Sequence, residues 1–198
     1  AERQFRLPLE YGGQRTPTSQ WTVTGAGAVL LGGGERGIHI TAATIGSIVD
    51  RGICDANNMG AAMAPAAAST LLHYFADTHT EPQEFDCIYT GDLGQVGSSL
   101  LRELLAAEGL LVKNHVDCGC ILFDAAEQQV KSGGSGPGCC AAVLCGHILP
   151  RLLRRSQKRV LFVATGALMS QTTFLQKESI PAVAHLVELR APEKESGA

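Results

Sequence analysis

The segment with the clearest chemical potential is the glycine-rich stretch Ser132–Gly138, which reads Ser-Gly-Gly-Ser-Gly-Pro-Gly. Glycines let a backbone approach a ligand closely, and the free N–H groups at the start of a helix attract anions. The stretch lacks the Gly-Lys-Ser/Thr ending of a P-loop and the Gly-x-Gly-x-x-Gly spacing of a dinucleotide site. Two interpretations stay open: a loop that faces a small ligand, and a tight turn that only packs the next helix.

A second group of reactive side chains lies in Asn114-His-Val-Asp-Cys118, which holds an imidazole, a carboxylate and a thiol within five residues. A nucleophile and its base need that mixture. Catalytic partners usually come from separate segments, however. A hydrogen-bonded His115 and a buried, structural Cys118 are therefore the favoured interpretation.

Three further polar residues precede expected helices. Asp92 stands between two glycines after an expected strand, and it is either a site carboxylate or the N-cap of the helix that begins near Leu93. Asn57 and Asn58 also precede a helix, so capping is their default role.

The elements that must position these residues alternate between strand and helix. Residues 21–31 and 38–48 should form two strands that pair with each other as a hairpin. We expect helices at 60–75, 93–107 and 139–153, and further strands at 85–90, 120–123, 159–164 and 181–189. This order predicts a sheet covered by helices, with ligands bound beyond the carboxyl ends of its strands. The segments expected at that edge are Gly91–Gly94, Ser132–Gly138 and Thr165–Ser170.

Composition narrows the classes of function. The 198 residues are 45% hydrophobic and carry a net charge of −3, which argues against nucleic-acid binding. The only dense basic run, Arg151–Arg155 with Lys158 and Arg159, suits a solvated helix C-terminus, and contact with anionic lipid is the alternative. The seven cysteines are odd in number and not spaced for zinc, and no signal peptide or membrane span is visible. We expect a reduced, intracellular protein without a metal, whose sequence begins inside a longer chain because it starts without Met.

Six segments together resemble the stage V sporulation protein AD family of the thiolase-like superfamily. They are Gln20–Ala28, Asn57–Ala68, Tyr89–Gly94, Asn114–Gly119, Gly133–Cys139 and Leu161–Ser170. The resemblance implies an α/β fold of two similar halves, layered α-β-α-β-α. Residues 1–50 would end the first half, 51–190 would form the second, and 191–198 would be a charged tail.

The same resemblance implies a function and partners. The protein would bind dipicolinic acid (pyridine-2,6-dicarboxylic acid), or its calcium chelate, for uptake into the developing spore. It would be a homodimer, peripheral at the spore inner membrane beside the other stage V A proteins, with no cofactor and no nucleic acid.

The resemblance also bears on catalysis. Ketoacyl-synthase relatives keep a His after the first strand of the second half, and a His or Asn in the glycine loop; here those places hold Asp92 and Ser135. These side chains cannot replace groups that stabilise an oxyanion and move a proton. We therefore expect a non-catalytic binder, with an acyltransferase or a ligand-free scaffold as alternatives. The candidate ligand-binding residues are Asn57, Asn58, Met59, Asp92, His115, Cys118, Gly134, Ser135 and Gly136.

Overall fold

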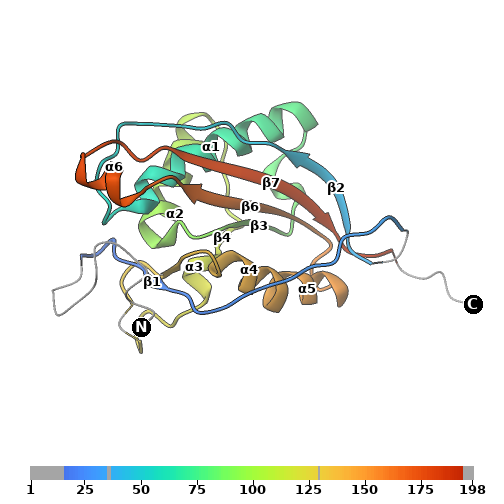
Figure 1. The fold of residues 1–198 in the computed structure, drawn as a ribbon. Coiled ribbons are helices and arrows are strands. Elements are labelled where there is room, and N and C mark those ends of the chain that lie inside the picture. Colours follow the sequence, from blue (N-terminus) through green and yellow to red (C-terminus); the bar gives the residue numbers. More distant parts are fainter. Residues whose placement is uncertain (1–15, 35–36, 129, 194–198) are drawn as a thin grey trace, which may run out of the picture.

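The computed structural model describes residues 16–34, 37–128 and 130–193, and Figure 1 shows their arrangement. The strands are β1 (Trp21–Thr22), β2 (His39–Thr44), β3 (Cys87–Thr90), β4 (His115–Asp117), β5 (Gly134–Ser135), β6 (Arg159–Ala167) and β7 (Ala182–Arg190). The helices are α1 (Met59–Thr78), α2 (Gly94–Ala107), α3 (Cys118–Ile121), α4 (Cys139–Val143), α5 (Leu149–Leu153) and α6 (Gln171–Leu175). A 3₁₀ turn covers Pro82–Glu84, and a π turn, Leu144–Ile148, joins α4 to α5.

Five strands form the central sheet in the order β2-β7-β6-β3-β4. β3 runs parallel to both β4 and β6, whereas β7 runs antiparallel to β6 and to β2. β1 and β5 form a separate parallel pair. Helices lie on both faces of the sheet, with α1 and α2 on one side and α4 and α5 on the other (Figure 1).

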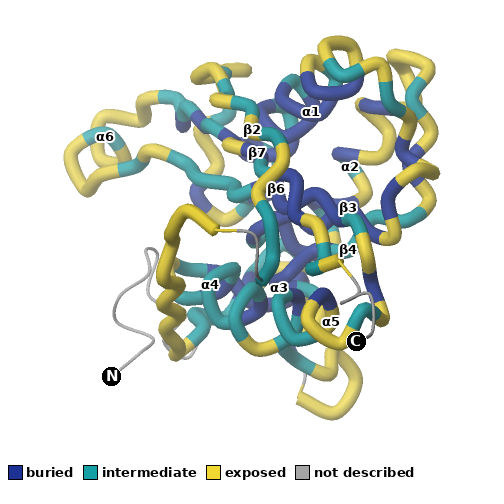
Figure 2. The backbone as a smooth tube through the Cα atoms, turned by 90° about the vertical axis from the view of Figure 1, so that its right-hand side faces the viewer, coloured by how far each residue is buried: buried dark blue, intermediate teal, exposed yellow. Residues whose placement is uncertain are grey.

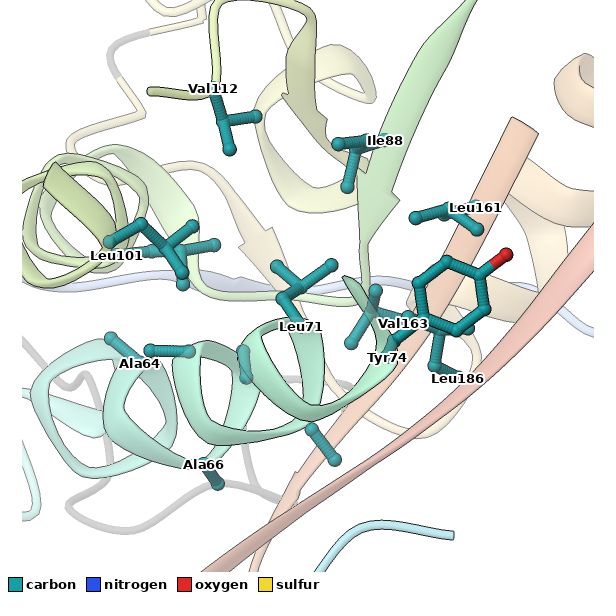
Figure 3. Close-up of a cluster of buried hydrophobic side chains, with 14 of the residues drawn as sticks. Ala64, Ala66, Leu71, Tyr74, Ile88, Leu101, Val112, Leu161, Val163 and Leu186 are labelled. Atoms are coloured by element: carbon teal, nitrogen blue, oxygen red, sulfur yellow. The ribbon is translucent and has the colours of Figure 1, made fainter. Parts of the chain in front are cut away.

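The face under α1 and α2 holds the larger core. Alanines on α1 and aliphatic side chains on α2 and the strands meet there, as Figure 3 shows for Ala64, Leu71, Leu101, Leu161 and Leu186. The two helices touch at their N-terminal ends, where a Cβ on Gly60 would lie 2.4 Å from the carbonyl oxygen of Leu93. Small residues thus let α1 and α2 start side by side at the same edge of the sheet.

The opposite face packs against one long helical segment made of α4, the π turn and α5. Its core includes Tyr89, Phe162, Cys139 and Ile148. The π turn has a local cause: Pro150 has no N–H, and its ring clashes with the carbonyl four residues back in a regular helix.

The expected α/β alternation from residue 60 onward is confirmed, but two local predictions are wrong. The hairpin of 21–31 with 38–48 does not form, because β1 pairs with β5 and β2 pairs with β7. Residues 120–123 are not a strand: β4 lies just before them, and the short helix α3 takes Cys118–Ile121.

The segment that follows β1 is unusual. Residues 24–34 are all exposed, as Figure 2 shows, and Leu30 is 98% exposed. Among the described residues, no backbone–backbone hydrogen bond involves residues 24–31, and the Ala28 carbonyl accepts from the Cys145 thiol at 3.8 Å. A strand-forming sequence therefore lies extended along α4 without a partner strand. No helix among the described residues is long and apolar enough to span a membrane.

Candidate functional site at the carboxyl ends of the parallel strands

The carboxyl ends of β3, β4 and β6 meet the glycine-rich loop at one edge of the sheet (Figure 1). β3 ends at Thr90 and continues into Gly91-Asp92-Leu93, and β4 ends at Asp117. Parallel neighbours in a sheet end at the same edge, so side chains distant in sequence gather there. Two polar networks result, one around Asp92 and one around Asp117.

Asp92 ties the glycine-rich loop to β6. Its Oδ2 accepts hydrogen bonds from the Ser135 hydroxyl at 2.7 Å and from the Gly136 N–H at 3.0 Å. Its Oδ1 accepts from the Thr165 hydroxyl at 3.0 Å, and that hydroxyl in turn accepts from the Asp92 N–H at 3.1 Å. The carboxylate is therefore a clamp between three segments, and it consumes the donors of Ser135 and Gly136 that were expected to face a ligand.

The alternative role of Asp92 as the N-cap of α2 is wrong, because Asp117 takes that place. The Oδ1 of Asp117 accepts from the Leu93 N–H at 2.9 Å and its Oδ2 from the Gly94 N–H at 3.0 Å. The same side chain caps α3 through the Gly119 N–H at 3.0 Å. One carboxylate thus holds the starts of two helices.

The Asp117 carboxylate is 2% exposed and also accepts from the Thr90 hydroxyl at 2.6 Å. Burial raises its pKa to about 6, against the hydrogen bonds, which lower it. All four of these hydrogen-bond donors are uncharged, so the charge is stabilised by dipoles alone.

His115 reaches the same network, since it lies two residues before Asp117 on β4 and shares its side of the strand. Its Nε2 lies 2.8 Å from the Thr90 hydroxyl oxygen. The Thr90 proton goes to Asp117, so the Nε2 must carry a proton and donate to Thr90. Burial lowers the pKa of His115 to about 4, with the charge of Arg102 as a smaller cause, which keeps the ring neutral near pH 7.

The glycine-rich loop is held mainly by its backbone. The carbonyls of Gly133 and Ser135 accept from the N–H groups of Trp21 and Val23, both at 2.9 Å. The Gln20 amide donates to the carbonyls of Asp92 at 2.9 Å and Gly134 at 3.1 Å. The loop is therefore a wall of the site whose place is fixed from both sides.

The cysteines near the loop do not form a nucleophilic centre. Cys118 is fully buried, and burial raises the pKa of its thiol, as it does for Cys120, whose pKa rises to about 12. A thiol with a raised pKa is a poor nucleophile. Within the described residues, no group of three or more His, Cys, Asp or Glu side chains could hold a metal ion.

Of the two residues expected to cap α1, Asn58 does so and Asn57 does not. Asn58 accepts the Ala61 N–H through its side chain at 3.2 Å, and the exposed Asn57 bonds to Asp55. Met59, partly buried, packs against the α1 core. The contact of Gly60 with Leu93 brings this helix start to the edge where Asp92 lies, but the Asn57 side chain turns to its own loop.

The candidate ligand-binding residues left out three polar members of the site: Thr90, Asp117 and Thr165. Asp117 and Thr165 lie in segments that the sequence had singled out, but neither was given a role. The available signal was the alternation of His115 and Asp117 on one face of a strand. Thr90 sits within ordinary β-forming sequence, which contains no signal that it would meet a carboxylate, whereas Thr165 begins the segment Thr165–Ser170 that was expected at this edge.

The fold and this edge define a three-layer α/β protein with a fully hydrogen-bonded polar network beyond its parallel strands. The model of the stage V sporulation protein AD family matches residues 1–190, and the chain belongs to that family. Stage V sporulation protein AD of Bacillus subtilis (strain 168) is 47% identical over 186 residues, which are 93% of this chain and 55% of that protein. The chain thus spans about half the length of this curated relative.

Among solved structures, AbyA1, a tetronic acid condensing enzyme, overlaps with 79% of this chain and 49% of its own. The TM-score is 0.45 and the sequence identity 16%. The mixed α/β class is confirmed by the elements themselves, and the layered pairing of two halves stays a prediction.

Proposed function

We propose that this chain belongs to a non-catalytic sporulation protein that binds dipicolinic acid or its calcium chelate for uptake into the developing spore. The observation that carries the non-catalytic part is the bond between Asp92 and Ser135. These residues stand where the resemblance expects catalytic groups, and they bond to each other instead. Neither presents a free donor for an oxyanion, and the thiol of Cys118 is buried.

The geometry refines how a dicarboxylate would meet this edge. The charged Asp92 would repel a free dianion, and its hydrogen bonds already use the Ser135 hydroxyl and the Gly136 amide. A calcium chelate removes this conflict, because Ca²⁺ accepts carboxylate oxygens from the ligand and the protein together. We therefore favour the chelate, with Asp92 at the metal side of the ligand and Gly134–Gly136 as the wall. Of the other candidate ligand-binding residues, Asn58 and Met59 lie at the start of the neighbouring helix α1.

We also propose that residues 1–50 complete a first α/β half, while 51–190 form the second. The exposed, unpaired stretch 24–31 supports this, since an apolar strand-forming segment without a partner needs a covering surface. The homodimer, the peripheral place at the spore inner membrane and the other stage V A proteins as partners belong to the same proposal.

Calorimetric titration of dipicolinate into the full-length protein, with and without calcium, tests the ligand. We expect binding heat and a raised melting temperature, both larger with calcium. Asp92→Asn should weaken the calcium-dependent part, whereas Asp77→Asn, on the exposed face of α1, should leave it unchanged. Absence of heat and of a thermal shift under both conditions would reject the binder, and an acyl-enzyme adduct in mass spectrometry would reject the non-catalytic assignment.

A further inference from the structure

Helix α5 ends at the corner where β6 begins and β7 ends (Figure 1). Its sequence places a cluster of cations there. The chain folds back tightly there: the Arg151 carbonyl accepts the N–H groups of Ser156 at 3.0 Å and Gln157 at 3.3 Å. This turn confines four basic residues to one short stretch of surface. They are Arg151, Arg154, Arg155 and Lys158, called the α5 corner below.

Among the described residues, the acids nearest to the α5 corner form no ion pair with its cations. Glu188 forms ion pairs with Arg159 and Arg190. Glu84 forms an ion pair with Arg159, and both arginines lie outside the corner. The Oδ2 of Asp86 accepts from the backbone N–H groups of Lys158 and Arg159, so Asp86 places one negative charge beside the four cations and leaves an excess of positive charge. Within the part of the chain that the structure describes, no ion pair involves a corner cation, and the Arg155 guanidinium donates to the Pro192 carbonyl.

The corner also presents an apolar side chain. Leu153 lies between the cations at the end of α5 and is 58% exposed. Cations around a protruding leucine fit an anionic lipid surface, where the charges meet headgroups and the leucine enters the interface. Arg151 is the basic residue in the last turn of α5, and the helix dipole acts within that turn, so the dipole does not account for all four cations. The whole chain is acidic, with a net charge of −3, so attraction to an anionic surface must come from a local patch.

We propose that the α5 corner docks the protein on an anionic lipid surface. This inference rests on the peripheral location proposed above and identifies the surface responsible for it. Each cation near such a surface strengthens binding by about fivefold, so removing two should weaken it by about 30-fold. Because the contact is electrostatic and solvent-exposed, added salt should weaken it as well.

The test is co-sedimentation of the full-length protein with vesicles of phosphatidylcholine, with and without about one third phosphatidylglycerol. The double variant Arg154→Gln/Lys158→Gln is compared with Arg51→Gln/Lys113→Gln, which removes two exposed cations elsewhere and leaves the same net charge. We expect the first pair to lose binding to the anionic vesicles and the second pair to keep it. Leu153→Ser should weaken vesicle binding and leave binding to a DNA duplex, the control polyanion, unchanged.

Equal losses in the two double variants would overturn the proposal, since net charge alone would then explain binding. Binding to the DNA duplex as tight as to the vesicles would also overturn it, because the corner would then be a general polyanion site. If the wild-type protein does not sediment with anionic vesicles, the α5 corner is not a lipid-docking surface. Direct lipid contact would then not explain the proposed peripheral location at the membrane. Dipicolinate titration of the Arg154→Gln/Lys158→Gln variant separates these outcomes from the ligand proposal, which predicts unchanged binding.

Discussion

Two buried carboxylates lie at opposite ends of the central strands and are held in opposite ways. Asp117 ends β4 at the carboxyl edge of the sheet, whereas Glu188 lies on β7 beside the start of β6. Both are 2% exposed. Asp117 nevertheless lies deeper in the molecule than Glu188, so the two acids differ in depth as well as in the groups that surround the charge.

Glu188 is stabilised by cations. Its Oε1 accepts from Arg159 at 2.8 Å and Arg190 at 2.6 Å, and the Tyr74 hydroxyl donates to its Oε2. Burial alone raises the pKa of Glu188, but these hydrogen bonds together outweigh burial and bring the pKa down to about 2. Asp117 has four uncharged donors instead, and there burial prevails and raises the pKa to about 6.

The difference shows that complete hydrogen bonding does not by itself favour the charged form of a buried acid. At Glu188 the two arginines, the Tyr74 hydroxyl and the shallower position together turn the pKa shift downward. At the carboxyl edge of the sheet, the charged form of Asp117 is therefore disfavoured by burial. The candidate site lies at the same edge. Perturbed groups of this kind gather at functional sites.

The largest expected effect comes from removing the ionised partner at the cation-held end. Glu188→Gln removes the buried acid from the half-buried Arg159, which keeps only the exposed Glu84, and should lower the free energy of unfolding by about 3 kcal/mol. Urea denaturation measures it. Glu84→Gln is the control, because Glu84 meets the same arginine at 3.2 Å but its side chain is 45% exposed, and its loss should cost less than about 1 kcal/mol. Equal costs for the two variants would contradict the assignment of stability to the buried pair.

Next in size is Asp117→Asn. The amide nitrogen would face the N–H groups of Gly94 and Gly119, which then lose their acceptor, so we expect a loss of about 2–3 kcal/mol. Asp77→Asn, on exposed surface, is the matched control and should be neutral. A loss below about 1 kcal/mol would show that the two helix starts do not depend on this carboxylate.

Asp92→Asn should have a smaller effect, about 1 kcal/mol, because Asp92 is only partly buried and Ser135 can reverse the direction of its hydrogen bond. Its signature should be local. Amide hydrogen exchange at Gly136 should accelerate in this variant, because the Gly136 N–H loses the Oδ2 acceptor. Unchanged exchange there, with faster exchange elsewhere, would mean that Asp92 does not clamp the loop.

Elements specified by local sequence could be predicted, whereas contacts between residues distant in sequence could not. Helix α1 and strand β6 were predictable because a continuous apolar or β-forming run specifies each locally. The pairing of residues 21–31 with 38–48 was wrong, since strand composition does not say which edge a strand will join, and β7 offered β2 an open edge. At the site, the glycine-rich loop was visible in sequence, but its contact with Asp92 spans 43 residues and depends on the topology.

The smallest effect is expected in the pH dependence of the intact protein, where two shifted groups oppose each other. Asp117 has a folded pKa of about 6 against 3.8, so the folded state binds more protons and stability falls as pH rises from about 4 to 6. His115 has a folded pKa of about 4 against 6.5, so the unfolded state binds more protons and stability rises over nearly the same window. Glu188 has a folded pKa of about 2 against 4.5, so its contribution to stability is lost at lower pH, as pH falls from 4.5 toward 2.

The two opposing slopes should leave the unfolding free energy of the intact protein constant within about 1 kcal/mol between pH 4.5 and 6. His115→Gln should unmask the Asp117 slope, so that this variant loses stability as pH rises through the window. Asp117→Asn should show the opposite slope, from His115 alone. Urea denaturation at several pH values measures all three profiles, and parallel profiles would mean that the two groups do not titrate as their surroundings dictate. Both variants leave Arg159 and Arg190 in place beside Glu188. The loss of unfolding free energy at low pH that comes from Glu188 should therefore appear in both of them.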